Sequence, residues 1–591
     1  MTAVNGVDWR SDRIWGRLRR VGAAALVPWS VWGLAGCAAL QPAARAPAPQ
    51  TAPAAVVRKI PPVPLTGKLL YHLLVGELAI QRGRVDFALK QYIDAARETR
   101  DPRVAEAAAR LAGYAHRKRL GLEAAERWAS LEPKSASAQE VAAVLAVRAA
   151  RNDKALAHLE RLLALPDPVG GQALLRVAGV LAAGPDRDTA LAVLKRLAQG
   201  QPKRAVVHLA LARVAFQARR LPLAAGEAKR ALALRTDWPP AALLLAEVHI
   251  RQGHTKSALA ELARVVDAHP RERRLRLAYA RLLLQAGRLP DATREFHVLV
   301  RQNPKDADAI YALGLLSLQA ERPKDARGYM ERLIKLGVRT DEAYYYLGRI
   351  AESEGHPHAA LTEYGRVSRG ELGLDAQIRI ARILALQGDV QAARARLANL
   401  RRRLPRMAVR LYLAEAEILR EAKRYRQAMT VYDQALRRYP DNNDLLYGRA
   451  LIAGHLGELQ RSEGDLRTIL ARDPDNTQAL NALGYTLADR TTHYQEALGY
   501  IRKALKRRPD DPAILDSMGW VQYRLGHTPQ ALSFLRRALK LSGGDDEIAA
   551  HLGEVLWISG EHAAARRVWH AALRRHPDST ALRAVVHRLA P

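Results

Sequence analysis

Cysteine is almost absent from this 591-residue chain, in which Cys37 is the only one. A single cysteine excludes an intramolecular disulfide and a zinc site built from several thiolates. Aromatic residues are also scarce, at 5% of the chain, whereas alanine, leucine and arginine dominate. Because these three are good helix formers, the composition favours an all-helical fold. The chain is too long for one ordinary domain, which leaves several domains or a repeat array.

Catalytic motifs are missing as well. The sequence contains no phosphate-binding glycine loop, no nucleophile elbow and no zinc-protease helix motif. His551 and Glu554 stand three residues apart, a spacing that suits two metal ligands on one helix, but no third or fourth ligand accompanies them. We therefore expect a protein without enzyme activity, without a metal and without a cofactor.

The first 36 residues have the organisation of a bacterial signal peptide. A basic start is followed by an apolar run from Val21 to Leu34, which is shorter than the about 20 apolar residues that a membrane-spanning helix needs. The run ends at Leu34-Ala35-Gly36-Cys37, which resembles the lipobox of bacterial lipoproteins. That resemblance implies removal of residues 1–36 and attachment of acyl chains, palmitate among them, at Cys37. An N-terminal membrane anchor with an incidental cysteine is the alternative reading.

The residues after Cys37 point to a location and a tether. Enterobacterial lipoproteins that stay in the inner membrane carry an aspartate after the cysteine, whereas this chain has Ala38. The resemblance therefore favours the outer membrane, with the protein facing the periplasm. Residues 37–68 are rich in proline and alanine, and such a tether stays extended, at roughly 3.1 Å per residue in polyproline II.

Beyond the tether, small residues recur at intervals of 33 to 35. A second small residue, such as Gly519 or Gly553, lies twelve positions before most of them. We expect each pair to mark a close approach of two helices, so that leucine at Gly519 or Ala531 would overpack the contact at a cost of about 1–3 kcal/mol. The recurring positions are Ala88, Gly121, Ala155, Ala190, Ala224, Ala258, Ala292, Ala326, Ala360, Ala393, Ala428, Ser462, Ala497, Ala531 and Ala565.

Glycine and proline keep the same register. Glycine five positions before the recurring residue predicts a left-handed turn between two helices, and proline twelve positions after it predicts the end of the second helix. The glycines are Gly83, Gly253, Gly287, Gly355, Gly388, Gly457, Gly526 and Gly560. The prolines are Pro202, Pro270, Pro304, Pro405, Pro440, Pro474, Pro509 and Pro577.

This combination resembles the tetratricopeptide repeat, whose period is near 34 residues. The resemblance implies an all-α superhelical solenoid of about fifteen helix-turn-helix units over residues 69–579. Leu582, Val585, Val586 and Leu589 form one apolar stripe after Pro577, which suits a capping helix over residues 580–591.

Members of this family bind peptides or proteins in a groove lined by the first helix of each unit. The resemblance places eight residues of the last units at exposed groove positions, and large aromatic side chains are common anchors of interfaces. These candidate site residues are Tyr447, Asn481, Tyr485, Asp516, Trp520, Tyr523, Glu554 and Trp557. A second contact zone is predicted at Tyr311, Tyr344, Tyr345 and Tyr346. Packing between adjacent repeats is the competing explanation for these aromatic residues.

The charge of +33 would ordinarily suggest nucleic acid as a partner, but a signal peptide argues against that. Removal of residues 1–36 takes away five arginines and two aspartates and leaves about +30. The surplus could serve anionic envelope polymers or phospholipid headgroups. A generally solvated basic surface remains an equal alternative.

Parts of the chain resemble a narrower group, the large outer-membrane repeat lipoproteins of proteobacteria. The residues that carry this resemblance are Asn481–Arg490, Asp516–Trp520, His551–Trp557, Thr99–Pro102 and Val104–Glu106. One type in the group is an adaptor that binds a carboxyl-terminal processing protease and presents peptidoglycan hydrolases to it. The resemblance thus implies a scaffold that holds protease and substrate together. A scaffold lipoprotein of exopolysaccharide export or outer-membrane assembly is the alternative function.

Overall fold

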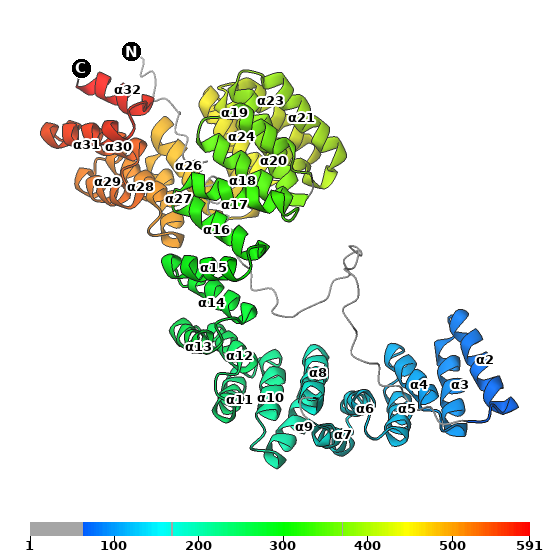
Figure 1. Ribbon diagram of the computed structural model, residues 1–591. Coiled ribbons are helices and arrows are strands. Elements are labelled where there is room, and N and C mark those ends of the chain that lie inside the picture. Colours follow the sequence, from blue (N-terminus) through cyan, green and yellow to red (C-terminus); the bar gives the residue numbers. More distant parts are fainter. Residues whose placement is uncertain (1–62, 167–168, 369, 591) are drawn as a thin grey trace. The chain divides into compact units, whose positions relative to one another are not determined.

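A computed structural model of the chain describes residues 63–166, 169–368 and 370–590 (Figure 1). These residues form 31 α-helices and one 3₁₀ turn, and they contain no strand. The predicted all-helical repeat fold is confirmed. The predicted signal peptide, Cys37 and most of the tether lie outside the described residues. Within the described ranges, no helix is both long and apolar enough to cross a bilayer.

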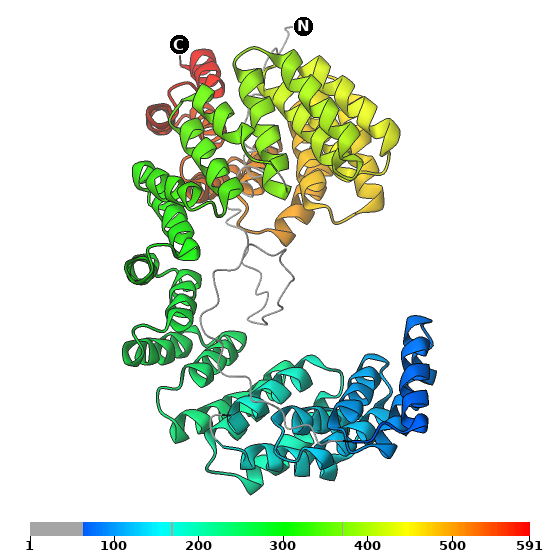
Figure 2. The ribbon, with the colours of Figure 1, turned by 45° about the vertical axis from the view of Figure 1, so that its right-hand side comes forward.

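The described helices divide between Val338 and Arg339 into two compact units. In each unit the helices follow one another as antiparallel pairs joined by short turns (Figures 1 and 2). The helices before the division are α2 (Gly67–Gln81), α3 (Val85–Glu98), α4 (Pro102–Tyr114), α5 (Lys118–Leu131), α6 (Ala136–Arg148), α7 (Asn152–Ala164), α8 (Val169–Ala183), α9 (Arg187–Gly200), α10 (Ala205–Gln217), α11 (Leu221–Leu234), α12 (Pro239–Arg251), α13 (Thr255–Ala268), α14 (Arg273–Gln285), α15 (Leu289–Gln302), α16 (Ala307–Gln319) and α17 (Pro323–Lys335).

The second unit continues the same pattern and ends in a short helix at the predicted capping position. Its elements are α18 (Thr340–Ser353), α19 (Pro357–Gly365), α20 (Gly370–Leu386), α21 (Val390–Arg403), η1 (Pro405–Met407), α22 (Ala408–Glu421), α23 (Tyr425–Arg438), α24 (Asn443–Leu456), α25 (Leu459–Arg472), α26 (Thr477–Arg490), α27 (Tyr494–Arg507), α28 (Pro512–Arg524), α29 (Thr528–Ser542), α30 (Asp546–Ile558), α31 (His562–Arg575) and α32 (Thr580–Leu589).

The turn inside each repeat uses a left-handed residue. All eight glycines predicted for this position have φ between 71° and 97°. In five other repeats the same position holds a residue with a side chain, at φ between 53° and 59°. A left-handed conformation is costly for such residues, so the tertiary fold imposes the turn even where the local sequence does not favour it. These five residues are His116, Ala150, Arg219, Glu321 and Lys423.

The predicted prolines lie just beyond the second helices. Pro474, for example, follows α25 by two residues, and Asn476 then begins the next first helix. The Asn476 side chain accepts a hydrogen bond from the backbone N–H of Ala479 at 3.0 Å. Such a cap satisfies one of the free N–H groups at a helix start. Residues on both sides of the inter-repeat loop therefore specify where one helix ends and the next one begins.

Small residues mark the closest approach of paired helices, as the period predicts. A Cβ atom added to Gly519 would lie 2.6 Å from Leu535 Cγ, and one added to Gly553 would collide with the Trp569 ring. Both Leu535 and Trp569 are buried. The two helices of a repeat can pack at this distance because these positions lack a side chain.

A polar couple links the two helices in five repeats, and its members are always 19 residues apart. Two of the couples are buried, and in one of them His208 Nδ1 lies 2.6 Å from Glu227 Oε2 and His208 Nε2 lies 2.9 Å from the carbonyl oxygen of Pro202. The couple thereby joins the helix pair to the preceding loop. The five couples are His72–Gln91, Gln139–His158, His208–Glu227, Arg276–Glu295 and Gln377–Arg396.

Candidate functional site

Three successive first helices, α26, α28 and α30, build the candidate site. Neighbouring members of the set pack on one another. Each begins at a side-chain cap, provided by Asn476, Asp511 and Asp545. Because the repeats are of nearly equal length, residues at equal positions in the three helices face the same side. The caps and the repeat period therefore align the three helices, so that a row of side chains on each helix lies beside the equivalent row on the next helix.

His551 is the centre of a buried cluster on these helices. Its Nδ1 lies 3.0 Å from both carboxylate oxygens of Asp516, and its Nε2 lies 3.4 Å from the hydroxyl oxygen of Tyr485. The Trp520 ring stacks on the imidazole at a centroid distance of 4.4 Å and an interplanar angle of 26°. One histidine thus joins side chains from three repeats.

Surrounding carboxylates keep this histidine charged. Burial by itself lowers the pKa of His551, but Asp516, Glu547 and Glu554 outweigh that effect and raise the pKa to about 9. The imidazole is therefore a cation at neutral pH, and it donates its Nδ1–H to Asp516. Carboxylates outnumber this cation in its immediate surroundings, although the whole chain is strongly basic.

Three of the eight predicted site residues are buried and the other five are half-buried, which corrects the expectation from the sequence that all eight are exposed. The exposed fractions of Asp516, Trp520 and Glu554 are 7%, 4% and 7%. His551 covers Asp516 and Trp520. Arg588 of α32 donates a hydrogen bond to Glu554 Oε2 at 2.6 Å. The sequence interpretation treated His551 as a weak metal ligand and missed that its ring fills the space between repeats.

The other predicted site residues are half-buried, and the structure brings some of them to the cluster. Tyr485 belongs to it, and the ring centroid of Tyr523 lies 5.3 Å from that of Trp520. Trp557 instead packs against α31, where Arg566 lies 5.3 Å from its ring centroid. The competing explanation, packing within the repeat array, therefore accounts for part of these aromatic residues.

Tyr447 and Asn481 complete the predicted set. Tyr447 lies on α24, one repeat before the cluster, and burial raises the pKa of its phenol. Asn481 lies on α26, and its buried Oδ1 has no hydrogen-bond partner among the described residues. The buried Nε1 of Trp520 also has no partner there. The site thus contains one unsatisfied acceptor and one unsatisfied donor.

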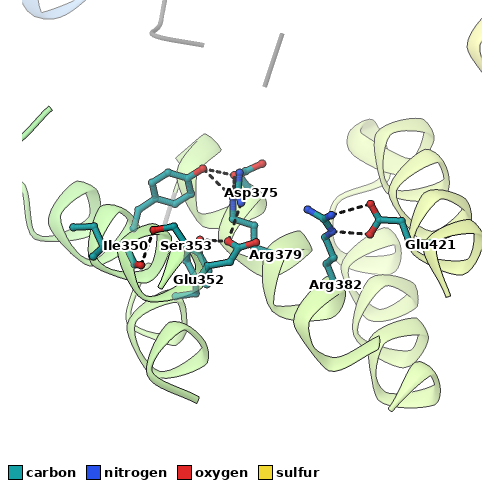
Figure 3. A network of polar contacts seen from close by, with 9 residues as sticks. Ile350, Glu352, Ser353, Asp375, Arg379, Arg382 and Glu421 are labelled. Carbon is teal, nitrogen blue, oxygen red and sulfur yellow. Dashed lines mark hydrogen bonds and ion pairs between the residues drawn. The ribbon is translucent and has the colours of Figure 1, made fainter. Parts of the chain in front are cut away.

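One residue of the predicted second contact zone, Tyr345, belongs to a polar network around Asp375, Arg379 and Glu352 (Figure 3). Tyr345 of α18 is buried, and its hydroxyl donates to Asp375 Oδ2 at 2.5 Å. Arg379 of α20 donates to Asp375 at 3.0 Å and to Glu352 at 2.9 Å. Burial and the Asp375 carboxylate raise the pKa of Tyr345 to about 12.

A bidentate pair extends this network to the next repeat, where Arg382 donates to both oxygens of Glu421 at 2.6 and 2.9 Å (Figure 3). Tyr344 and Tyr346 flank the network and are half-buried. Tyr311 lies on α16, in the other unit. Because Arg379 and Arg382 both lie on α20, their contacts with Glu352 and Glu421 tie α18, α20 and α22 together.

No group of three or more histidine, cysteine, aspartate or glutamate side chains in the part of the chain that the structure describes is arranged to hold a metal ion. His551 and Glu554, the pair with ligand spacing, make separate contacts with Asp516 and Arg588.

Comparisons with known proteins agree with the fold. Tetratricopeptide-repeat family models match residues 141–205, 249–316, 311–376, 378–443, 413–477, 447–512 and 486–546. The TPR repeat-containing protein PA4667 of Pseudomonas aeruginosa is 45% identical over 462 residues, which cover 77% of each chain.

Solved structures with similar helix arrangements include TTC0263, a thermophilic tetratricopeptide-repeat protein of Thermus thermophilus, at 24% identity. It matches 30% of this chain and 96% of its own, with a TM-score of 0.28. YrrB, described as having an unusual peptide-binding site, is 21% identical over 28% of this chain and 84% of its own, with a TM-score of 0.24. Both TM-scores lie below 0.5, so these structures add nothing to the comparison of sequences.

Proposed function

Since the chain belongs to the tetratricopeptide-repeat family, we propose that it is a scaffold that binds protein partners through the last repeats, around α26, α28 and α30. One observation carries the proposal, namely the unsatisfied Trp520 Nε1 donor and Asn481 Oδ1 acceptor. A buried polar group without a partner costs about 1–3 kcal/mol, and an extended peptide brings both carbonyl and N–H groups. Because Trp520 is buried, we expect a bound segment to displace the neighbouring Tyr523 ring.

The electrostatics of the site favour a neutral or basic partner segment. Asp489, Asp516 and Glu547 all act on the Tyr485 phenol, and Glu554 acts on His551. Three of these carboxylates already have cationic partners, because Arg490, His551 and Arg588 pair with Asp489, Asp516 and Glu554. The site is therefore close to neutral and, among the described residues, offers an acidic segment no unpaired cation. This charge preference distinguishes binding in the groove from a general attraction of anionic envelope polymers to the basic surface.

For the identity of the partner, we propose a carboxyl-terminal processing protease together with peptidoglycan hydrolases as its substrates. Support comes from the resemblance of Asn481–Arg490, Asp516–Trp520 and His551–Trp557 to lipoprotein adaptors of that kind. Two of these stretches supply Trp520 and His551 to the buried cluster. A scaffold of this type raises the effective concentration of substrate near protease without chemistry of its own. We further propose that lipid on Cys37 anchors the protein to the outer membrane, facing the periplasm.

The test is an affinity capture from envelope extract with the mature lipidated protein as bait. We expect a processing protease among the captured proteins, and we expect Tyr485→Ala with Tyr523→Ala to abolish its capture. Tyr114→Ala is the matched control, because Tyr114 is an aromatic residue of the other unit with an exposed fraction of 80%. Capture of polysaccharide-export proteins in place of a protease would contradict the proposed partner. Equal capture by all variants would contradict the proposed site.

A further inference from the structure

A cavity lies between the second helices of the last two repeats, α29 and α31, and residues of α30 also line it. Its volume is about 530 Å³, which falls within the roughly 300–1,000 Å³ range of small-molecule sites. The floor is apolar and the rim is cationic. The apolar residues are Leu539, Ala549, Leu552, Val568, Ala571 and Ala572, and the cationic residues are Arg536, Lys540, Arg567 and Arg575.

The positive charge of this rim is poorly compensated. No acidic side chain lines the cavity. Among the described residues, no carboxylate lies within ion-pair distance of Lys540 or Arg567, and the pair of Arg536 with Glu561 is long, at 3.5 Å. Cations around a low-dielectric cavity concentrate a positive potential in it. The cavity therefore attracts an anion.

The fourth cation, Arg575, is held in position by the turn between α29 and α30. Gly543 and Gly544 have φ of +73° and +93°, which residues with a side chain rarely adopt. The carbonyl oxygen of Gly543 accepts a hydrogen bond from Arg575 Nη1 at 3.2 Å. A Cβ atom on Gly544 would collide with the same guanidinium. The turn thus makes room for Arg575 and orients it at the rim.

We propose that this cavity binds an anionic amphiphile, that is, an aliphatic chain that carries a carboxylate or phosphate headgroup. Guanidinium groups match both headgroups in geometry and charge. The floor suits an aliphatic chain because it removes apolar surface from water. A peptide fits less well, since no side chain of the lining can accept hydrogen bonds from buried peptide N–H groups.

A cavity in the other unit serves as an internal comparison. It occupies about 640 Å³ between α9 and α11, the second helices of two neighbouring repeats, and Lys195 and Arg230 line it. A carboxylate also lines this cavity, because Glu227 accepts a hydrogen bond from Arg230 at 2.6 Å and lies 2.6 Å from His208. Its cations are therefore partly neutralised. We expect no anion binding there.

Calorimetric titration of the full mature chain, with Cys37→Ser to remove its own lipid, tests the proposal. Laurate and dodecyl phosphate, below their micelle concentrations, should each bind at one site, and their relative affinity distinguishes a carboxylate from a phosphate ligand. Dodecyl maltoside has the same chain with a neutral headgroup, and inorganic phosphate has the headgroup without a chain, so both should bind at least tenfold more weakly. Equal affinity for dodecyl maltoside would overturn the proposal, as would stronger binding of an acidic peptide with an apolar carboxyl terminus.

Variants locate the site. Lys540→Gln with Arg567→Gln should weaken laurate binding at least tenfold, whereas Lys195→Gln with Arg230→Gln in the comparison cavity should leave it unchanged. Ala571→Phe keeps every charge but fills the floor, and it should also abolish binding. Circular dichroism establishes that each variant is folded. Equal losses of laurate affinity in the two charge variants would overturn the proposal, because they would reveal binding to the overall basic surface. Normal laurate binding by Ala571→Phe would also overturn it.

Discussion

Replacement of Gly519 by alanine is a sharp test of the packing inside a repeat. The new Cβ atom would lie 2.6 Å from Leu535 Cγ and 3.2 Å from the backbone oxygen of Ala531. The leucine can rotate, but the backbone oxygen belongs to α29 and cannot move without shifting the helix. Overpacking of this kind costs about 1–3 kcal/mol. Because alanine is also the better helix former by about 1 kcal/mol, we expect α28 and α29 to lose about 0–2 kcal/mol of local stability in total.

Hydrogen exchange of the α28 and α29 amides is the appropriate measurement, because a repeat array need not unfold in one step. Gly499→Ala is the matched control. Gly499 also lies within a helix, but nothing is within 4 Å of an added Cβ atom. Alanine is the better helix former by about 1 kcal/mol, so the control should be neutral or more stable.

A second substitution identifies the cause. Leu535→Ala removes the nearest atoms but leaves the Ala531 backbone oxygen in place. The double variant Gly519→Ala with Leu535→Ala should therefore be more stable than the two single effects predict by the part of the cost that the leucine causes, and simple additivity would assign the whole cost to the backbone oxygen. The reasoning fails if Gly519→Ala protects α28 and α29 as well as Gly499→Ala does.

The remaining predictions concern separate parts of the chain. The pKa of His551 rises from 6.5 to about 9 on folding. The stability that its charge contributes is therefore fully present below pH 6.5 and is lost as the pH rises through 9. Urea unfolding of the C-terminal repeats should show this decline in stability, and His551→Gln should flatten the pH dependence. Glu227→Leu should destabilise α10 and α11 by about 1–3 kcal/mol in hydrogen exchange, because it leaves His208 buried without its partner, and a further His208→Leu should restore part of the loss. Lys423→Gly should not lower the stability of its turn in thermal unfolding. Glycine adopts the left-handed conformation without strain, and this gain offsets the larger conformational entropy that glycine has in the unfolded chain. A clear loss of stability would contradict this. Metabolic labelling with palmitate should tag the wild type and not Cys37→Ser, and equal labelling would exclude lipidation at Cys37.

The repeat architecture could be predicted because glycine and proline act locally. Gly526 permits a left-handed turn and Pro509 ends a helix whatever surrounds them. His116 and Lys423 occupy the same left-handed turn without any local signal, so only their distance from the recurring small residue could have revealed them. The polar couples also had a signal, since His208 and Glu227 keep the 19-residue spacing of Gln139 and His158.

The candidate site was harder to predict because its burial depends on contacts between repeats. Trp520 occupies a groove position by register, yet His551 from the next repeat stacks on it. Glu554 occupies an equivalent position, yet Arg588 of the last helix reaches it. Register along one helix indicates which face a side chain takes, whereas only the packing of the neighbouring helix determines how much of that face stays open.

Partner affinity at two salt concentrations tests the central claim most directly. The captured partner is titrated with wild type and with Tyr485→Ala and Tyr523→Ala combined, at low and at high salt, after circular dichroism shows both proteins folded. Aromatic anchors of an interface can contribute about 2 kcal/mol or more, whereas exposed ion pairs contribute about 0–1 kcal/mol and are screened by salt. The account predicts that the aromatic variant binds poorly at both salt concentrations while the wild type retains its affinity. Normal binding by the variant, together with loss of wild-type binding at high salt, would contradict it and would place recognition on the basic surface.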